Sequence, residues 1–166
     1  MAKSKTASFY IRRHIDCTTI APQVVTLDTS AYVDPADRQG LMIESVDFVF
    51  YDSSNNLPIT SGSDRQTSVQ LLSGGYTALE AFDNEDLVAS AGFYVDAGQG
   101  VYNDNDMYPD LLGTPEGRII VDDQMSIVAA SNAAFSNARC ALLIKAKVVT
   151  LTNKDYMALA LQTVAN

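Results

Sequence analysis

The chain has very few of the residue types from which most catalytic and metal sites are built. Its 166 residues include one histidine, two cysteines and no tryptophan. A zinc site made of several His and Cys ligands is nearly excluded, because only His14, Cys17 and Cys140 are available. A Ser–His–Asp or Cys–His catalytic constellation would have to use His14. We expect His14 to lie at the surface or at an interface, because Tyr10 and two arginines surround it on a predicted edge strand.

The two cysteines allow at most one internal disulfide bond. Cys17 and Cys140 both lie in apolar, strand-like surroundings. We favour a buried free thiol for each of them, with a Cys17–Cys140 disulfide as the alternative.

Basic residues are scarce, with 11 Lys and Arg against 20 Asp and Glu and a formal net charge of −9. Binding of nucleic acid by the general surface is therefore not expected, because phosphate contacts need clustered Lys and Arg. Positive charge concentrates only near the N-terminus, at Lys3, Lys5, Arg12 and Arg13. This pattern indicates either a frayed terminus before an edge strand or an arm that reaches a neighbouring subunit or an anionic surface such as lipid headgroups or nucleic acid.

Long apolar runs are absent, and none approaches the roughly 18 residues of a membrane-spanning helix. The N-terminus lacks the apolar core of a secretory signal peptide. Gly-Gln-Gly at 98–100 lacks the lysine and the following helix of a phosphate-binding loop. We therefore expect a protein kept inside a cell, or inside a particle assembled there, and no cofactor.

Alternation of apolar and polar residues predicts β-strands along most of the chain. The longest such stretch is 139–151, whose even positions are apolar (Cys140, Leu142, Ile144, Ala146 and Val148). Other strands are predicted at 8–15, 23–28, 41–51, 66–72, 87–95 and 118–130, with a doubtful one at 57–60. We expect 118–130 to be one continuous strand that pairs antiparallel with 139–151. About eight strands without an internal repeat predict an all-β sandwich of single jelly-roll or Greek-key type.

The apolar period changes after Leu151 and predicts a C-terminal helix at 153–164, with Thr152 as its N-cap. Tyr156 and Leu159 widen the apolar sector, and no charged residue follows Asp155. A helix this apolar needs cover on more than one side, and we expect another subunit to provide part of it. The predicted organisation is a flexible basic arm at 1–7 and a single sandwich domain at 8–166, with one or two helical turns at 77–85.

The longest irregular segment is 97–117, and loops of this length usually have a function such as contact with a neighbour. Asp104, Asp106 and Asp110 are weak candidates for a calcium site. The glycine and terminal glutamate of an EF-hand are missing in register, so a solvated loop is favoured over a metal site. Asp83, Glu85 and Asp86 form a second acidic group, which is interpreted as a turn before a strand.

The order of these parts resembles a known family of viral shell proteins. A short basic arm, about eight strands and a long loop before two strands lead to a closing segment, T-L-T-N-K-D-Y-M-A-L-A-L-Q, from Thr150. This layout resembles the single jelly-roll major capsid protein, small type, of tailless icosahedral prokaryotic viruses with an internal membrane, the sphaerolipovirus-like group. The resemblance implies a structural virion protein with no catalytic residues. It implies as partners further copies of the chain, a second capsid protein and the internal membrane, but no specific nucleic acid.

The function predicted from these features is therefore a self-assembling capsid subunit, assembled in the host cytoplasm and located in the virion. The alternatives are a non-catalytic carbohydrate-binding or adhesin-like module that uses the long loop, and a phage decoration or fibre domain. Paired carboxylates for glycoside hydrolysis are disfavoured, because clefts of that kind are usually lined by aromatic residues and tryptophan is absent. The residues expected at interfaces are Lys3, Lys5, Arg12, Arg13, Tyr102, Tyr108, Tyr156, Leu159 and Leu161.

Overall fold

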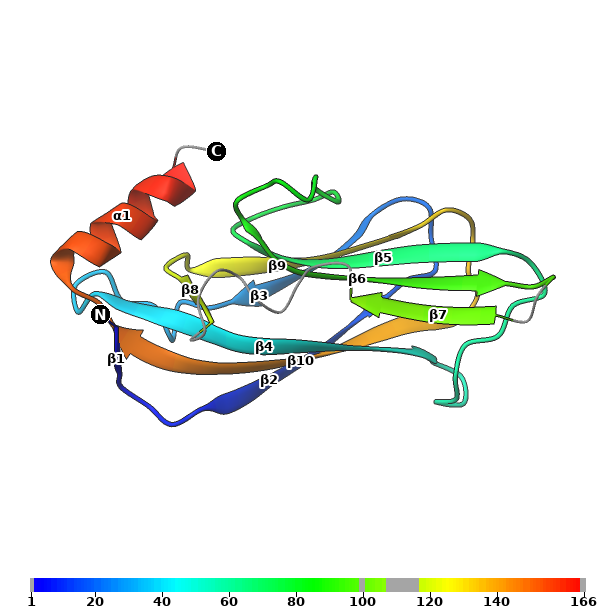
Figure 1. The fold of residues 1–166 in the computed structure, drawn as a ribbon, viewed down its shortest axis with the longest axis horizontal. Helices are drawn as coiled ribbons and strands as arrows, with labels where there is room; N and C mark the ends of the chain where they lie inside the picture. The colour runs from blue at the N-terminus through cyan, green and yellow to red at the C-terminus, as the bar shows by residue number, and fades with distance from the viewer. Residues whose placement is uncertain (1, 99–100, 107–116, 165–166) are drawn as a thin grey trace.

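The computed structural model describes residues 2–98, 101–106 and 117–164, and within these ranges the side chains of 101–106 and 162–164 are not described. These residues form two facing antiparallel sheets and one terminal helix, α1 (Asn153–Val164) (Figure 1). The β10 sheet contains β1 (Lys3–Ser4), β2 (Phe9–Asp16), β10 (Ala138–Thr150), β4 (Gln39–Asp52) and β8 (Arg118–Ile120). The β5 sheet contains β3 (Gln23–Asp28), β9 (Gln124–Ser131), β5 (Arg65–Ser73), β6 (Leu87–Asp96) and β7 (Val101–Asp106).

The strand order is that of a jelly roll. In one sheet β2 pairs with β10, β10 with β4 and β4 with β8, while the other sheet has the order β3-β9-β5-β6-β7. Among the described strands the chain changes sheet six times: between β2 and β3, β3 and β4, β4 and β5, β7 and β8, β8 and β9, and β9 and β10. Two interleaved Greek keys of this kind define the jelly-roll sandwich. The predicted all-β jelly-roll class with a C-terminal helix is therefore confirmed.

The alternating pattern of β10 determines where the core lies. Its even positions from Cys140 to Val148 are buried, whereas its odd positions from Arg139 to Lys147 are partly exposed. Phe93 of the opposite sheet lies between two further rings, with centroid distances of 5.4 Å to Phe50 and 6.3 Å to Phe135. The two sheets thus enclose one apolar layer between them.

The prediction of one continuous strand over 118–130 is wrong, and so is its predicted pairing with 139–151. β8 pairs with β4, whereas β9 lies in the other sheet between β3 and β5. The break falls at Asp122 and Asp123, whose backbone carbonyls accept hydrogen bonds from Thr29: its Oγ1 donates to Asp122 (2.7 Å) and its N–H to Asp123 (2.8 Å). An apolar alternation shows which side chains point inward, but both sheets have an inward face, so it does not show that the strand changes sheet.

Two smaller predictions also differ from the structure. The segment 57–60 is not a strand, and the segment 77–85 contains turns and no helix. Instead, residues 74–86 form a loop over the outer face of the β5 sheet, where Tyr76 and Leu79 pack on Leu72, Leu87 and Val128. We call this segment the 74–86 loop.

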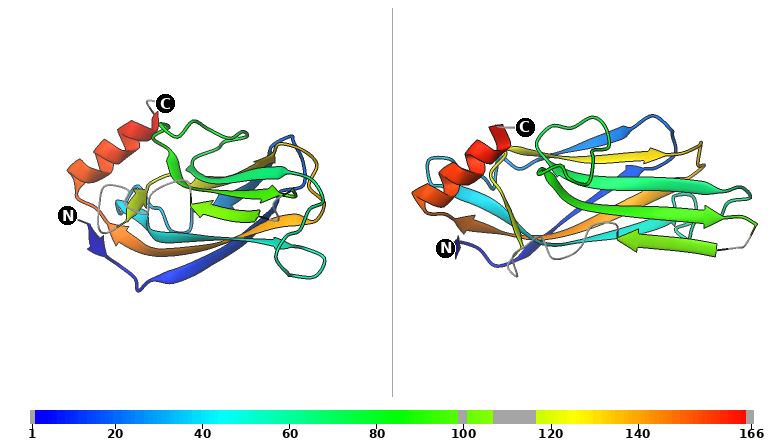
Figure 2. Two further views of the ribbon diagram at one scale, coloured as in Figure 1. Left: turned by 45° about the vertical axis from the view of Figure 1, so that its right-hand side comes forward. Right: turned by 45° about the horizontal axis from the view of Figure 1, so that its top comes forward.

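The helix α1 begins with the predicted cap, because the Asp155 N–H donates a hydrogen bond to Thr152 Oγ1 (3.2 Å). Tyr156 and Leu159 join it to an apolar cluster that also contains Met42, Val149 and Leu151. The helix stands at one end of the sandwich and projects beyond the sheets (Figures 1 and 2). In the part of the chain that the structure describes, no helix is long and apolar enough to cross a membrane.

The N-terminal residues lie along the edge of β10. Lys3 and Ser4 pair with Thr150 and Val149, and the Val148 N–H donates a hydrogen bond to Thr6 Oγ1 (3.0 Å). This is the segment for which the sequence predicts a flexible arm. The division into an arm at 1–7 and a domain at 8–166 stays a prediction.

Replacing Gly117 by alanine should destabilise the protein by about 2 kcal/mol or more. Gly117 has φ +102°, and a Cβ at this position would overlap the carbonyl oxygen of Ile43 on β4. The free energy of unfolding, measured by urea denaturation, tests this expectation. Gly62→Ala is the matched control, because a Cβ at Gly62 has no atom within 4 Å. Equal stability of the two variants would contradict the close approach of Gly117, just before β8, to β4.

Candidate functional site

His14 lies where the sequence predicts it, exposed on β2. Within the described part of the chain β2 pairs with β10 alone and is an edge strand, and the backbone of His14 lies opposite Ala141. Among the described residues, no group of three or more His, Cys, Asp or Glu side chains could hold a metal ion.

Both cysteines are buried, and neither forms a disulfide bond. Burial raises the pKa of the Cys17 thiol to about 12, despite a hydrogen bond with Thr67 that lowers it. The thiol therefore stays protonated at neutral pH and does not supply a nucleophilic thiolate. Cys17 and Cys140 both belong to the apolar core between the sheets.

The weak calcium candidates fall largely outside what the structure describes. The backbone of Asp104 and Asp106 belongs to β7, but their side chains, like that of Tyr102, are not described. Tyr108 and Asp110 lie outside the described residues.

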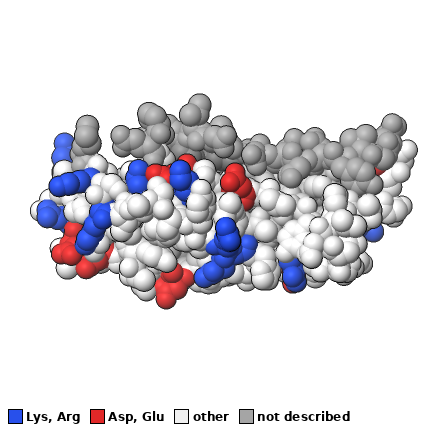
Figure 3. Space-filling model, turned by 90° about the horizontal axis from the view of Figure 1, so that it is seen from below, with Lys and Arg blue, Asp and Glu red and all other residues white. Residues whose placement is uncertain are grey.

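The predicted basic interface residues do not form one continuous patch. Figure 3, seen from the side of β2, shows Lys and Arg in separate groups among acidic residues. Lys5 Nζ lies 3.7 Å from Asp37 Oδ2, and Arg13 donates a hydrogen bond to the carbonyl of Arg12 (2.8 Å). Lys3, Arg12 and Arg13 are exposed at the edge of the β10 sheet.

A well-defined charged cluster in this sheet surrounds Glu44. Its carboxylate lies 2.9 Å from Lys147 Nζ and 3.3 Å from Lys145 Nζ, and it accepts a hydrogen bond from Ser8 Oγ (2.7 Å). These contacts lower the pKa of the Glu44 carboxyl to about 2, and the hydrogen bond with Lys147 contributes most. The cluster joins β4 and β10 to the residue just before β2, so it is a structural anchor.

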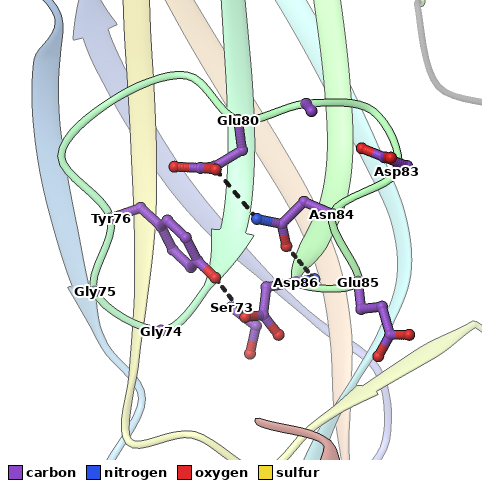
Figure 4. Close-up of a pocket in the computed structure, with 10 residues that line it drawn as sticks. Ser73, Gly74, Gly75, Tyr76, Glu80, Asp83, Asn84, Glu85 and Asp86 are labelled. Carbon is purple, nitrogen blue, oxygen red and sulfur yellow. Dashed lines mark hydrogen bonds between the residues drawn. The ribbon is translucent and has the colours of Figure 1, made fainter. Parts of the chain in front are cut away.

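A hollow with a volume of about 840 Å³ lies beneath the 74–86 loop and is lined by Ser73, Tyr76, Glu80, Asp83, Glu85 and Asp86, among others (Figure 4). We call it the acidic pocket. Tyr76 Oη donates a hydrogen bond to Asp86 Oδ2 (2.5 Å), and Asn84 Nδ2 donates one to Glu80 Oε2 (3.2 Å). Burial raises the pKa of the Tyr76 hydroxyl, and so does its hydrogen bond to Asp86.

Polar side chains of the β5 sheet outside the pocket lining hold the 74–86 loop in place. Gln70 donates a hydrogen bond to the Glu80 carbonyl (2.9 Å) and accepts one from the Glu80 N–H (2.7 Å). Ser126 Oγ donates to the Gly74 carbonyl (2.8 Å) and accepts from the Tyr76 N–H (2.9 Å). Sequence reasoning identified Asp83, Glu85 and Asp86 as an acidic group but missed this scaffold, because Gln70 and Ser126 come from two distant strands.

Asp122 lies where the chain crosses between the two sheets. Its side chain accepts a hydrogen bond from Ser73 Oγ. Burial raises the pKa of Asp122, and repulsion from Asp86 and Asp123 adds to this effect, while the hydrogen bond with Ser73 lowers the pKa. At neutral pH its negative charge therefore opposes folding.

A second hollow, of about 380 Å³, lies on the outer face of the β5 sheet. We call it the β5 groove, and its lining includes Gln66, Ser68, Leu79, Gly92, Tyr94 and Asn132. Its lining residues, all within the described part of the chain, carry no charge. Burial raises the pKa of the Tyr94 hydroxyl, and the nearby carboxylates of Asp96 and Asp64 raise it further.

The interface residues predicted on α1 differ in their burial. Tyr156 and Leu159 are half-buried against the sandwich, whereas Leu161 is 63% exposed and Met157 57% exposed. The helix therefore has one side packed on its own chain and another apolar side open to solvent.

Replacing Glu44 by glutamine should lower the free energy of unfolding at pH 7 by about 1 kcal/mol. The folded-state pKa lies below the usual 4.5, so this stabilisation is complete above pH 4.5 and is lost as the pH falls towards 2. Urea denaturation at a series of pH values should show the difference between the variant and the original chain shrinking in that window. Asp37→Asn, which removes an exposed ion pair, is the control and should change stability by less than about 0.5 kcal/mol. A pH-independent difference at Glu44 would contradict the assignment.

Replacing Asp122 by asparagine should have the opposite sign and raise stability at pH 7. Asparagine keeps an oxygen that accepts the Ser73 hydrogen bond but removes the buried charge. Since the folded-state pKa is raised, the gain should shrink as the pH falls and Asp122 itself becomes protonated. Thermal unfolding of Asp122→Asn and Asp122→Ala separates charge from hydrogen bonding, because only the alanine variant loses the acceptor. Destabilisation by asparagine at pH 7 would contradict this account.

Comparison with known proteins does not show a family for this chain. No protein-family model matches the chain, and no curated protein does either. Among solved structures, a chain described as Desmodium yellow mottle tymovirus is similar, with a TM-score of 0.45 and 8% sequence identity over 89% of each chain. Similarity at this level carries no argument about function.

Proposed function

We propose that the chain is a self-assembling structural subunit of an icosahedral viral shell. The observation that carries the proposal is the incomplete cover of α1. The helix has 12 residues, and Tyr156 and Leu159 pack on the apolar cluster of the sandwich, while Asn153 accepts a hydrogen bond from Arg38 at the start of the helix (3.4 Å). An isolated helix of this length is marginal in water and depends on tertiary packing.

The open side of α1 is suited to contact with another protein surface. Met157 and Leu161 are exposed and four residues apart, so they lie on one face of the helix. Burying two such side chains stabilises an interface by roughly 1.5–3 kcal/mol each. Leucine and methionine at this spacing are typical of a helix that binds a groove.

The fold is compatible with this role. Jelly-roll sandwiches serve as viral capsid proteins, as lectin domains and as cupins, so the fold alone does not decide between these classes. The uncovered helix favours the first class, because a shell subunit is completed by its neighbours.

The finer proposal follows the sequence resemblance. In it, the chain is the small single jelly-roll capsid protein of a virus with an internal membrane and acts without catalysis or cofactors in the virion. Its partners are copies of itself, a second capsid protein and, through Lys3, Lys5, Arg12 and Arg13, the membrane beneath the shell. The exposed positions of these basic residues at one sheet edge support contact with an anionic surface.

Leu161→Asp should prevent assembly while leaving the subunit folded. Leu161 is exposed in the isolated chain, so a charge there changes its stability by no more than about 0.5 kcal/mol. In an interface the same charge loses its solvation without a partner, and assembly should weaken at least tenfold or so. Light scattering and negative-stain microscopy measure assembly, and circular dichroism measures folding. Leu161→Met, which keeps an apolar side chain, should assemble normally.

Two results would overturn the proposed function. One is an original chain that stays monomeric at high concentration and joins no partner from its own particle. The other is a Leu161→Asp variant that assembles as well as Leu161→Met.

A further inference from the structure

Two uncharged surfaces lie open within the described part of a chain whose net charge is −9. One is the exposed apolar part of α1, and the other is the β5 groove. Two copies with the same net charge repel each other. Contact is therefore favoured between surfaces that carry no negative charge of their own. These two surfaces meet that condition.

The exposed face of α1 has a defined chemical pattern. Lys154, Met157 and Leu161 occupy positions i, i+3 and i+7, which lie on one side of a helix, and all three are exposed. The face is therefore basic at the start of the helix and apolar in the following turns.

The β5 groove has the complementary pattern. Leu79 and Tyr94 provide apolar surface in its lining, and Gln66 and Ser68 provide uncharged polar groups. Outside the lining, exposed Asp64 directly precedes β5 and accepts a hydrogen bond from the N–H of Ala97, which follows β6 (3.0 Å). It therefore lies at the end of the groove where Gln66 pairs with Tyr94. A helix seated in the groove thus finds an acidic residue near one end, which matches Lys154.

The two surfaces lie apart along the long axis. Most of the groove lining comes from the start of β5, the end of β6 and residues at the end of β9, with Leu79 added by the 74–86 loop, whereas α1 follows the far end of β10 (Figure 1). A chain therefore does not place α1 in its own groove, but a second copy can do so. A contact between two different surfaces of identical copies is heterologous, and repetition of such a contact closes rings when the rotation between copies allows it.

We propose that the β5 groove binds the exposed face of α1 from a neighbouring copy of this chain. Met157 and Leu161 enter the groove beside Leu79 and Tyr94, and Lys154 lies near Asp64. This contact deepens the proposed shell function and rests on it, because the same interface links successive subunits of one particle.

The test uses full-length chains with single cysteine substitutions. Chains with Ser68→Cys in the groove are mixed with chains carrying Leu161→Cys on α1 and oxidised under assembly conditions. Mass spectrometry should find a disulfide between positions 68 and 161 of different chains. Cys17 and Cys140 are buried and do not interfere. The control mixes Leu161→Cys with Thr26→Cys, which is exposed on β3 of the same sheet, and should give at least about tenfold less disulfide.

A charge exchange provides a second readout. Lys154→Glu should weaken assembly, because it places two acidic residues together, and Asp64→Lys in the neighbouring copy should restore it. Rescue by this pair would support the contact. Asp64 also accepts a hydrogen bond from the Ala97 N–H (3.0 Å), so circular dichroism of Asp64→Lys alone is the control for folding.

The outcomes separate this inference from the proposed function. Particles that form without the 68–161 disulfide would overturn the groove contact and leave the shell function standing. The disulfide without particles would support the contact and overturn the shell. If a neutral oligosaccharide instead protects the introduced thiol of the Ser68→Cys chain from alkylation and no 68–161 disulfide forms, the groove is a carbohydrate site and the contact is overturned.

Discussion

The structure depends most on the pairing of β10 with neighbours along both of its edges. One edge pairs with β4 along the whole length of β10, and the other pairs first with β2 and then with β1. Because side chains alternate along a strand, the register of these pairs sends five consecutive even-numbered apolar residues, Cys140 to Val148, inward. A slip of one residue would bury Lys145 and Lys147 and expose the core. On the outward face of the same sheet, the Glu44 carboxylate forms ion pairs with Lys145 and Lys147. These ion pairs favour the same register.

The same constraint explains how much of the molecule the sequence predicts. Strand 139–151 and helix 153–164 were predicted closely, because in each the apolar period arises within one element and needs no information from elsewhere. The break at Asp122 was not predicted, because the hydrogen bonds that favour it come from Thr29 and Ser73, which are distant in sequence. Local pattern specifies an inward face, whereas the choice of sheet is a tertiary property.

The candidate site follows the same division. The exposed apolar helix could be anticipated from the absence of charge after Asp155, since no single small domain would cover such a helix on every side. The β5 groove could not, because it takes its walls from β5, β6 and β9, whose order is set only by the jelly roll. The acidic pocket is lined by residues 73–86 alone, but the side chains that hold this loop come from distant strands. Gln70 shows the difficulty: its amide holds the 74–86 loop from a position that sequence alone assigns to an ordinary strand.

The distribution of charge connects the fold to the proposed assembly. A surplus of nine negative charges opposes association, and at physiological salt this repulsion extends about 8 Å from the surface. Specific contact then requires surfaces that exclude water and bring no further negative charge together, and the open faces of α1 and the β5 groove have this property. In the proposed contact, their separation along the sandwich directs one copy onto the next. The net acidity of the chain then opposes competing pairings that bring acidic residues of two copies together.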